Sequence, residues 1–376
     1  MTQIESDTSQ QANAWSPNSH CLALDGIRGL AILAVTLYRL CKELDPEAHP
    51  VLAIIRRFAP VGERGVDLFF VLSGFLITGI LLRTKSQPHY FRNFMARRVL
   101  RIFPLYFLSL VLGILVIPNL LNTNSFDLAS REQFYLWTYT SNFRMAWLNE
   151  WCFGAFDHFW SLAVEEHFYL IWPAVVLLLT RRQLCIVCMT IIAVVCVART
   201  VAALDSRFDV AVSVATFFRA DGLSFGAMLA ILLTSSISRV TIRRAGWVML
   251  ALLLPLLFGV AVIGQRFLEI PSTLCPAVCS ASMAVVLLSN RKASLVRLLE
   301  SGCLRALGKY SYGMYVIQLP LVTMLPMTKM ISLLPTDPLI ASSVYVIGMF
   351  AMIILIAMVS FHFFESHFLR LKKLYS

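Results

Sequence analysis

Long runs of apolar residues, separated by short polar segments, are the feature of this sequence that most restricts its fold. A helix needs about 20 such residues to cross roughly 30 Å of hydrocarbon. The chain is 58% hydrophobic and only 14% charged, whereas soluble domains carry about 25% charged residues. The sequence therefore predicts an all-α integral membrane protein with about ten transmembrane helices. We place these at 25–41, 65–82, 99–119, 159–180, 184–203, 211–234, 246–264, 271–289, 308–327 and 340–363.

The distribution of Lys and Arg between the predicted spans indicates an orientation. With the N-terminus inside, the connections on that side carry nineteen basic residues and the opposite connections carry ten, counting Arg199 among the ten. Cytoplasmic loops are enriched in Lys and Arg, so we predict that both termini are cytoplasmic. The predicted organisation is a disordered tail over 1–24, a ten-helix domain over 25–365 and a basic tail over 366–376, in the inner (plasma) membrane. No cleavable signal peptide is evident.

The net charge of +11 comes from short basic clusters between apolar runs. This pattern favours anionic lipid headgroups or a phosphorylated substrate as partners, and not nucleic acid. Oligomeric state is not readable from the sequence. Most of the nine cysteines fall in apolar runs, where cysteine behaves as a small hydrophobic residue. Cys185 and Cys188 have a spacing found in metal sites but no nearby histidine, so no metal is expected.

Ionisable residues inside predicted spans are functional candidates, because they are costly in hydrocarbon. On the first helix, Arg28 and Arg39 are eleven residues apart. This spacing corresponds to ~1100° of rotation and returns to within ~20° of the same face. An alternative for Arg39 is that its side chain reaches the outer headgroups.

On the fourth predicted helix, His158, Ser161 and Glu165 form one stripe. Glu165 would lie ~10 Å below the surface, where a carboxylate must be paired or protonated. The alternative to a functional role is a buried pair between Glu165 and an arginine that holds two helices together. Glu166 points elsewhere and could have that structural role instead.

Two further places carry buried charges. In the sixth span, Arg219 needs a partner on another helix, because Asp221 is too close in sequence to face it; a structural cross-helix pair is as consistent with this pattern as a site. At the cytoplasmic mouth of the third span, Arg97, Arg98 and Arg101 form a cluster of cations. Arginine suits phosphate, although such clusters commonly mark only a span boundary.

Six segments in this order resemble the membrane-bound acyltransferase 3 family, whose members transfer acyl groups to cell-surface sugars. They are "LDGIRGLAILAVTLYRL", "GVDLFFVLSGFLITGILL", "RRVLRIFPLYF", "HFWSLAVEEHFYLIWP", "FRADGLSFGAML" and "LGKYSYGMYVIQLP". Each segment alone is weak evidence for the resemblance, whereas all six in this order are strong evidence.

The resemblance implies a cytoplasmic acyl-CoA donor, acetyl-CoA by default, and no permanently bound cofactor. The acceptor would be a hydroxyl of an extracytoplasmic sugar or glycolipid. Arg28 matches the first residue of the family's Arg-(ten residues)-His motif, and the arginines at 97, 98 and 101 match those expected to hold CoA phosphates. Glu165 matches the glutamate of W-S-L-x-x-E-E, with His158 just before it. Substrate or structural roles are implied for Asp67, Ser73, Arg219, Asp221 and Gln318.

The sequence departs from the family at two positions. Arg39 replaces the histidine of the first helix and Gln318 replaces a histidine of the ninth. Acyl transfer needs a base, and guanidinium has no lone pair to offer near neutral pH, although it can stabilise an oxyanion. One hypothesis is therefore an active enzyme with His158 or Glu165 as the base. Another is a member that has lost catalysis and kept binding or regulation. A transporter is the third, and the arginine cluster and motif order argue against it.

Overall fold

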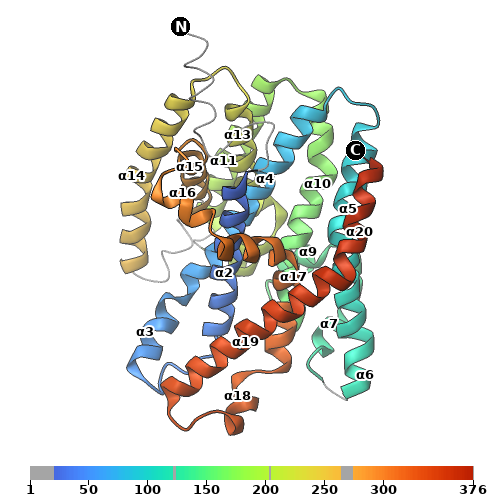
Figure 1. Cartoon of the computed structure of the whole chain (residues 1–376), viewed down its shortest axis with the longest axis vertical. Coiled ribbons are helices and arrows are strands. Elements are labelled where there is room, and N and C mark those ends of the chain that lie inside the picture. The colour runs from blue at the N-terminus through green and yellow to red at the C-terminus, as the bar shows by residue number, and fades with distance from the viewer. Residues whose placement is uncertain (1–20, 122–123, 203–204, 264–273, 376) are drawn as a thin grey trace. The chain divides into compact units, whose positions relative to one another are not determined.

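Helices form the regular secondary structure of this protein. The computed structural model describes residues 21–121, 124–202, 205–263 and 274–375, and these ranges contain α-helices with short 3₁₀ and π segments and no strand (Figure 1). Seven helical stretches in these ranges are long and apolar enough to cross a membrane: Pro50–Thr84, Tyr90–Leu121, Gly154–Leu178, Arg181–Ala202, Asp209–Leu233, Arg239–Leu257 and Pro338–Tyr375. The prediction of an all-α, multi-pass membrane protein is confirmed.

The remaining three predicted spans coincide with helices that are shorter or more polar. They are α2 (Leu22–Cys41), α15 (Leu274–Leu287) and α17 (Gly302–Met324). The count of ten spans and the cytoplasmic termini stay predictions. Residues 1–20, 203, 264, 271–273 and 376 of the predicted tails and spans lie outside the described residues. The predicted C-terminal tail is helical over α20 (Ser366–Leu371) and η9 (Lys372–Tyr375).

The chain divides into two compact units. Unit 1 comprises Met1–Leu30, Asp67–Gln87 and His167–Lys309, and unit 2 comprises Ala31–Val66, Pro88–Glu166 and Tyr310–Ser376. The division passes through α2, α4 (Gly65–Thr84), α10 (Trp160–Leu178) and α17. Each of these helices therefore contributes residues to both units.

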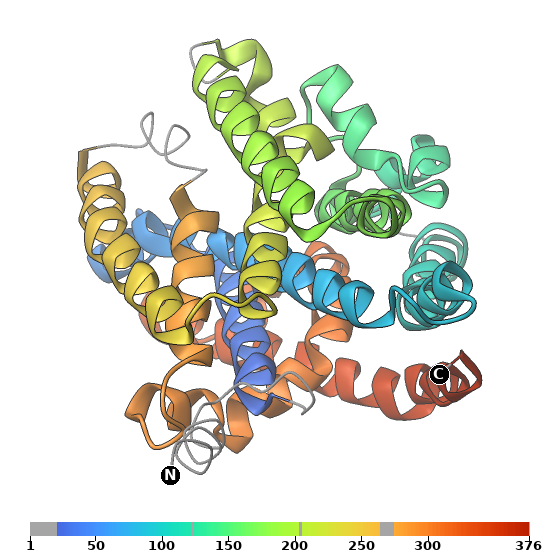
Figure 2. The same cartoon turned by 90° about the horizontal axis from the view of Figure 1, so that it is seen from above.

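In unit 1, pairs of long helices pack closely. α11 (Arg181–Ala202) lies along α13 (Thr216–Leu233), and α14 (Arg239–Ile263) lies along α15, as Figures 1 and 2 show. The unit also contains η4 (Ser206–Phe208), α12 (Asp209–Val214) and α16 (Ser294–Leu299). Helices in lipid associate through close packing of small residues. Gly226 illustrates this, because a Cβ there would lie 2.0 Å from the carbonyl oxygen of Val71 on α4.

In unit 2, α5 (Tyr90–Leu110) continues through the π-helix η2 (Val111–Val116) into α6 (Ile117–Leu121) and packs against α20 and η9 (Figure 2). α3 (Pro50–Phe58) and η1 (Ala59–Arg64) precede α4. The C-terminal part contains α18 (Met327–Met330), η7 (Ile331–Leu333), α19 (Pro338–Ser360) and the π-helix η8 (Phe361–Glu365).

The predicted outer loop over 120–158 folds into short helices of unit 2. They are α7 (Asp127–Arg131), α8 (Gln133–Trp137), α9 (Ser141–Leu148) and η3 (Gly154–Phe159). Aromatic stacking holds these short helices to α5. The centroid of the Tyr106 ring on α5 lies 4.1 Å from the centroid of the Tyr139 ring and 4.7 Å from that of the Phe159 ring. The Tyr106 hydroxyl also donates to the carbonyl of Leu136 at 2.7 Å. These contacts place η3 against the membrane helices.

We expect Gly226→Ala to destabilise the protein by about 1–3 kcal/mol, because the added methyl group overlaps the α4 backbone. Thermal unfolding in detergent measures the loss. Gly348→Ala on α19 is the matched control, since a Cβ there meets nothing within 4 Å, and its effect should stay within about 0.5 kcal/mol. Equal stability of the two variants would contradict the close approach of α4 and α13.

Candidate functional site

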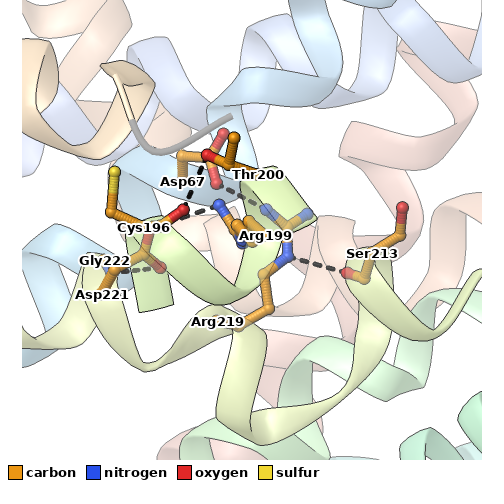
Figure 3. A network of polar contacts seen from close by, with 8 residues as sticks. All are labelled: Asp67, Cys196, Arg199, Thr200, Ser213, Arg219, Asp221 and Gly222. Carbon is orange, nitrogen blue, oxygen red and sulfur yellow. Dashed lines mark hydrogen bonds and ion pairs between the residues drawn. The ribbon is translucent and has the colours of Figure 1, made fainter. Parts of the chain in front are cut away.

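Two buried ion pairs form the polar centre of unit 1 (Figure 3). Arg219 Nη1 lies 3.1 Å from Asp67 Oδ1, and Arg199 Nη1 lies 3.2 Å from Asp221 Oδ2. All four side chains are at most 7% exposed. Arg219 thus pairs with a residue of another helix, Asp67 on α4, as the absence of a suitable partner on its own helix predicted.

The four charges cancel, and backbone groups complete the network. Arg219 Nε donates to the carbonyl of Ser213 at 2.7 Å, and the Gly222 N–H donates to Asp221 Oδ1 at 2.8 Å. Asp221 is also within electrostatic reach of Arg219 and Asp67. A neutral network of this kind avoids the large cost of an isolated buried charge. It joins α4, α11 and α13.

The assignment of Arg199 to an outer connection is wrong. This residue lies inside α11 and is 1% exposed. An arginine near the end of an apolar run usually marks the membrane boundary, but here Asp221 on α13 neutralises its charge within the protein. The sequence showed no such partner, because the two residues lie on different helices.

The other predicted residues of unit 1 lie on α2 and α4. Arg28 is half-buried in the first part of α2. Ser73 on α4 shares a hydrogen bond of 3.0 Å with the hydroxyl of Tyr169 on α10. Ser73 therefore links two helices of this unit. The structure groups the remaining predicted residues in unit 2: Arg39, Arg97, Arg98, Arg101, His158, Glu165 and Gln318.

A tight turn brings His158 into the interior of unit 2. Gly154 has a φ of +54°, a left-handed conformation that glycine adopts without strain. Asp157 Oδ1 then accepts the N–H of Phe153 at 2.8 Å. Phe156 packs where Gly113 of η2 lacks a side chain. This turn leaves the His158 side chain fully buried.

The backbone of His158 is held by two hydroxyl groups. The Tyr315 hydroxyl donates to the His158 carbonyl at 3.0 Å, and the Ser161 hydroxyl does so at 3.2 Å. The two hydroxyl oxygens are 2.6 Å apart, and the Tyr315 ring meets the imidazole edge-on with centroids 5.2 Å apart. Among the described residues, neither imidazole nitrogen makes a hydrogen bond of good geometry, although backbone groups of Tyr315 and Val316 interact with the ring as weaker hydrogen-bond acceptors. The ring is thus held in place, and neither of its nitrogens is engaged by a hydrogen bond of good geometry.

A second buried polar contact joins α2 to α17 in the same unit. The Thr36 hydroxyl donates to Gln318 Oε1 at 3.0 Å, and both side chains are fully buried. Within the described ranges, Nε2 of Gln318 has no hydrogen-bond partner. The amide is therefore anchored through its oxygen.

Arg39 lies one turn after Thr36 on α2 and is half-buried. Its guanidinium lies over the Tyr38 ring, 5.2 Å from the centroid. The positive charge acts electrostatically on His158, Tyr315 and Asp157. In the part of the chain that the structure describes, Arg39 makes no ion pair within 4 Å and its Nε has no hydrogen-bond partner. Arg39 and His158 therefore belong to one polar centre of unit 2, which we call the His158 centre. It also contains Ser161 and Tyr315 beside His158, and the Thr36–Gln318 contact.

The two adjacent carboxylates of α10 differ in their surroundings. Glu165 is half-buried and within electrostatic reach of Tyr315. Glu166 is only 6% exposed and is within reach of Arg98 and Tyr312. Glu165 thus borders the His158 centre, whereas Glu166 borders the arginine cluster of α5.

That arginine cluster contacts the C-terminal helical segment. Arg97 Nε donates to the carbonyl of Tyr375 at 2.7 Å, and its Nη2 donates to the same oxygen. Arg98 lies over the Phe94 ring at 5.7 Å, and Arg101 is within electrostatic reach of Glu365. All three arginines are half-buried. Their charges are close together but partly engaged by the protein itself.

Cysteine chemistry is not favoured beside the His158 centre. Cys152 is a free, half-buried thiol in the segment before η3. Burial, followed by the negative charges of Asp157 and Glu132, raises the pKa of this thiol to about 11. Because the thiolate is the nucleophile, Cys152 is a poor acyl carrier at neutral pH. Among the described residues, no group of three or more His, Cys, Asp or Glu side chains is placed to hold a metal ion.

Two residues that lie beside His158 and Gln318 were not predicted from the sequence. Thr36 and Tyr315 each lie three residues before a predicted site residue, Arg39 and Gln318 respectively, so helical spacing could have identified them. Glu166 was expected to lie on another face than Glu165, where it could pair with an arginine of another helix. Its proximity to Arg98 depends on how α5 and α10 pack, which the sequence does not reveal.

Comparison with known proteins places the chain among acyltransferases. Residues 22–361 match the family described as Acyltransferase domain. The peptidoglycan O-acetyltransferase OatA of Listeria monocytogenes is 34% identical over 171 residues, which cover 42% of this chain and 24% of that protein. The O-acetyltransferase OatA of Staphylococcus aureus is 32% identical over 167 residues, covering 42% and 25%. These matches span about a quarter of each relative. No solved structure matches the chain.

We expect Asp67→Asn to destabilise the protein by about 3–5 kcal/mol, because it leaves the Arg219 charge buried without its partner. The double variant Asp67→Leu plus Arg219→Met should recover most of this loss. Thermal unfolding in detergent measures both. Glu132→Gln is the control, since it breaks a pair with Arg144 that is 27% exposed on each side and should barely change the unfolding temperature. A change that small for Asp67→Asn would show that the buried pair is not needed for the fold.

Proposed function

We propose that this chain, which belongs to the acyltransferase family that its sequence resembles, transfers an acyl group from acyl-CoA to a hydroxyl of a cell-wall sugar. Acetyl is the proposed group and peptidoglycan the proposed acceptor, since the relatives are peptidoglycan and other O-acetyltransferases. The proposed location is the inner (plasma) membrane, with the donor entering from the cytoplasm.

The observation that carries this proposal is the state of His158. Its backbone carbonyl is fixed by the hydroxyls of Tyr315 and Ser161, whereas its ring nitrogens are buried and not hydrogen-bonded within the described residues. Leaving buried polar atoms unpaired costs free energy. An acceptor hydroxyl bound at the ring would satisfy one of them, which is the arrangement that a general base requires.

The proposed reaction forms one bond and breaks another. The acceptor hydroxyl oxygen attacks the thioester carbonyl carbon while neutral His158 takes the hydroxyl proton. The C–S bond then breaks, and the proton passes to the leaving thiolate, so the products are an ester and a free thiol. Arg39 remains protonated and stabilises the negative charge that develops on the carbonyl oxygen. Glu165, at the border of the same centre, is the alternative base.

A second candidate function is binding or regulation by a chain that has lost catalysis. The observation that favours it is the presence of Arg39 and Gln318 where the family has histidine. The two candidates differ in whether the native chain transfers acyl groups at all. An imidazole at position 39 would restore the family residue and should rescue a lapsed enzyme.

The donor is proposed to bind through Arg97, Arg98 and Arg101. Their clustered guanidinium groups suit the phosphates of CoA. Arg97 already donates to the carbonyl of Tyr375, so donor binding would compete with this contact or share it. A thioester bound there would still have to reach the His158 centre, and both groups belong to unit 2.

We expect His158→Ala to lower acyl transfer about 10²–10⁴-fold, the usual contribution of a general base. The assay is transfer of labelled acetyl from acetyl-CoA to peptidoglycan sugars in membranes that contain the native chain or a variant. His362→Ala is the matched control, because this histidine is exposed and pairs with Tyr310; it should remain active. Loss with Glu165→Gln but not with His158→Ala would move the base to Glu165. Transfer seen only with Arg39→His would show that the native chain has lapsed.

We expect Arg97→Ala plus Arg98→Ala to weaken acetyl-CoA binding at least tenfold, because two phosphate-pairing charges are lost. Binding of labelled acetyl-CoA to the purified protein in detergent measures this directly. Arg56→Ala plus Arg57→Ala removes an adjacent arginine pair from α3 and should leave binding unchanged. Unaltered binding in both variants would rule out the proposed donor site.

A further inference from the structure

We propose that Gln318 is a catalytic residue that donates a hydrogen bond to the oxygen of the reacting carbonyl. The inference rests on the proposed acyl transfer and adds a role for a residue that replaces a histidine of the family. The observation behind it is that the oxygen of this amide accepts a hydrogen bond from Thr36, while its buried nitrogen has no hydrogen-bond partner among the described residues.

The contact with Thr36 determines which end of the amide is available. The Thr36 hydroxyl donates to Gln318 Oε1 at 3.0 Å. A primary amide offers one acceptor oxygen and one nitrogen with two N–H donors. Because the Gln318 oxygen already accepts a hydrogen bond, the NH₂ group remains, and this group can only donate. A buried donor without an acceptor costs about 1–3 kcal/mol, so a ligand that offers an oxygen there gains affinity.

The helices that carry this amide also line the His158 centre. On α17, Gln318 lies one turn after Tyr315, whose ring contacts the His158 imidazole. On α2, Arg39 lies one turn after Thr36, and its charge acts on His158. Residues three apart share a face of a helix. The amide nitrogen and the guanidinium are therefore two donors on faces that border one base.

Two donors beside a base are what the transition state of acyl transfer needs. As the hydroxyl oxygen bonds to the carbonyl carbon, the carbonyl oxygen becomes negative, and this charge is lost again when the C–S bond breaks. Donors that meet the developing charge lower the barrier, and glutamine side chains are among the groups that do so. Arg39 adds a full positive charge. Gln318 adds a neutral N–H donor, and the hydrogen bond from Thr36 to the Gln318 oxygen fixes the position of this amide.

A purely structural role for Gln318 makes a different prediction. If the amide only links α2 to α17, its loss should reduce stability, and activity should fall only as far as the folded fraction falls. An oxyanion donor acts mainly on the transition state. Its loss should lower kcat with little change in KM, even in protein that is fully folded.

The test compares Gln318→Met, which keeps the length of the side chain and removes the donor, with Thr36→Val, which keeps the amide and removes the group that holds it. Thr323→Val on α17 is the control, since its hydroxyl donates only to the backbone carbonyl of Leu319 in its own helix. The readouts are kcat and KM for acetyl transfer from acetyl-CoA to peptidoglycan sugars, with thermal unfolding measured for each variant.

We expect Gln318→Met to lower kcat about 10²–10³-fold with KM nearly unchanged, Thr36→Val to lower it about tenfold or more through misplacement of the donor, and Thr323→Val to have no effect. A folded Gln318→Met variant with native kcat would overturn the inference. If Gln318→Met does not fold, an unchanged kcat in Thr36→Val would overturn it instead. In either case an active native chain leaves the proposed function standing, whereas an inactive native chain rejects the proposed function itself.

Discussion

The cost of an unpaired polar group in a membrane interior governs the placement of the polar side chains in this protein. Hydrocarbon offers no hydrogen bonds, so each buried charge or amide must find its partner within the protein or in a ligand. In unit 1 the partner is internal, because Asp67 and Arg219 pair at 3.1 Å and Arg199 pairs with Asp221 at 3.2 Å. That network is neutral and holds three helices together.

In the His158 centre of unit 2, a backbone carbonyl is hydrogen-bonded, whereas several side-chain nitrogens are not. The His158 carbonyl accepts from two hydroxyls, and the Gln318 oxygen accepts from Thr36. The imidazole nitrogens, the Gln318 nitrogen and Arg39 Nε have no hydrogen-bond partner among the described residues. Rigid backbone support with uncommitted polar atoms is the arrangement that a preorganised site requires, because the site pays no reorganisation cost when it binds.

The sequence predicted the helical membrane fold and some of the residues that proved to be buried and polar, among them Asp67, His158, Arg219, Asp221 and Gln318. Apolar runs of sufficient length identify helices because hydrocarbon thickness sets their length, and each predicted span coincides with a helix over the residues described. Pairing was harder to predict. Arg219 was expected to pair across helices, but neither Asp67 nor the Arg199–Asp221 pair could be identified, since a partner on another helix leaves no trace in local spacing. Thr36 and Tyr315 differ in this respect, because each lies three residues before a predicted site residue on the same helix and could have been identified from that spacing.

The central claim is that the native chain, with arginine at position 39, acylates cell-wall sugars and uses His158 to do so. The most direct test is mass spectrometry of the cell-wall sugars from cells that lack the protein, cells that carry the native chain and cells that carry the His158→Ala chain. We expect an ester-linked acetyl group that is absent in the first, present in the second and absent again in the third. Identical sugars in all three would contradict it.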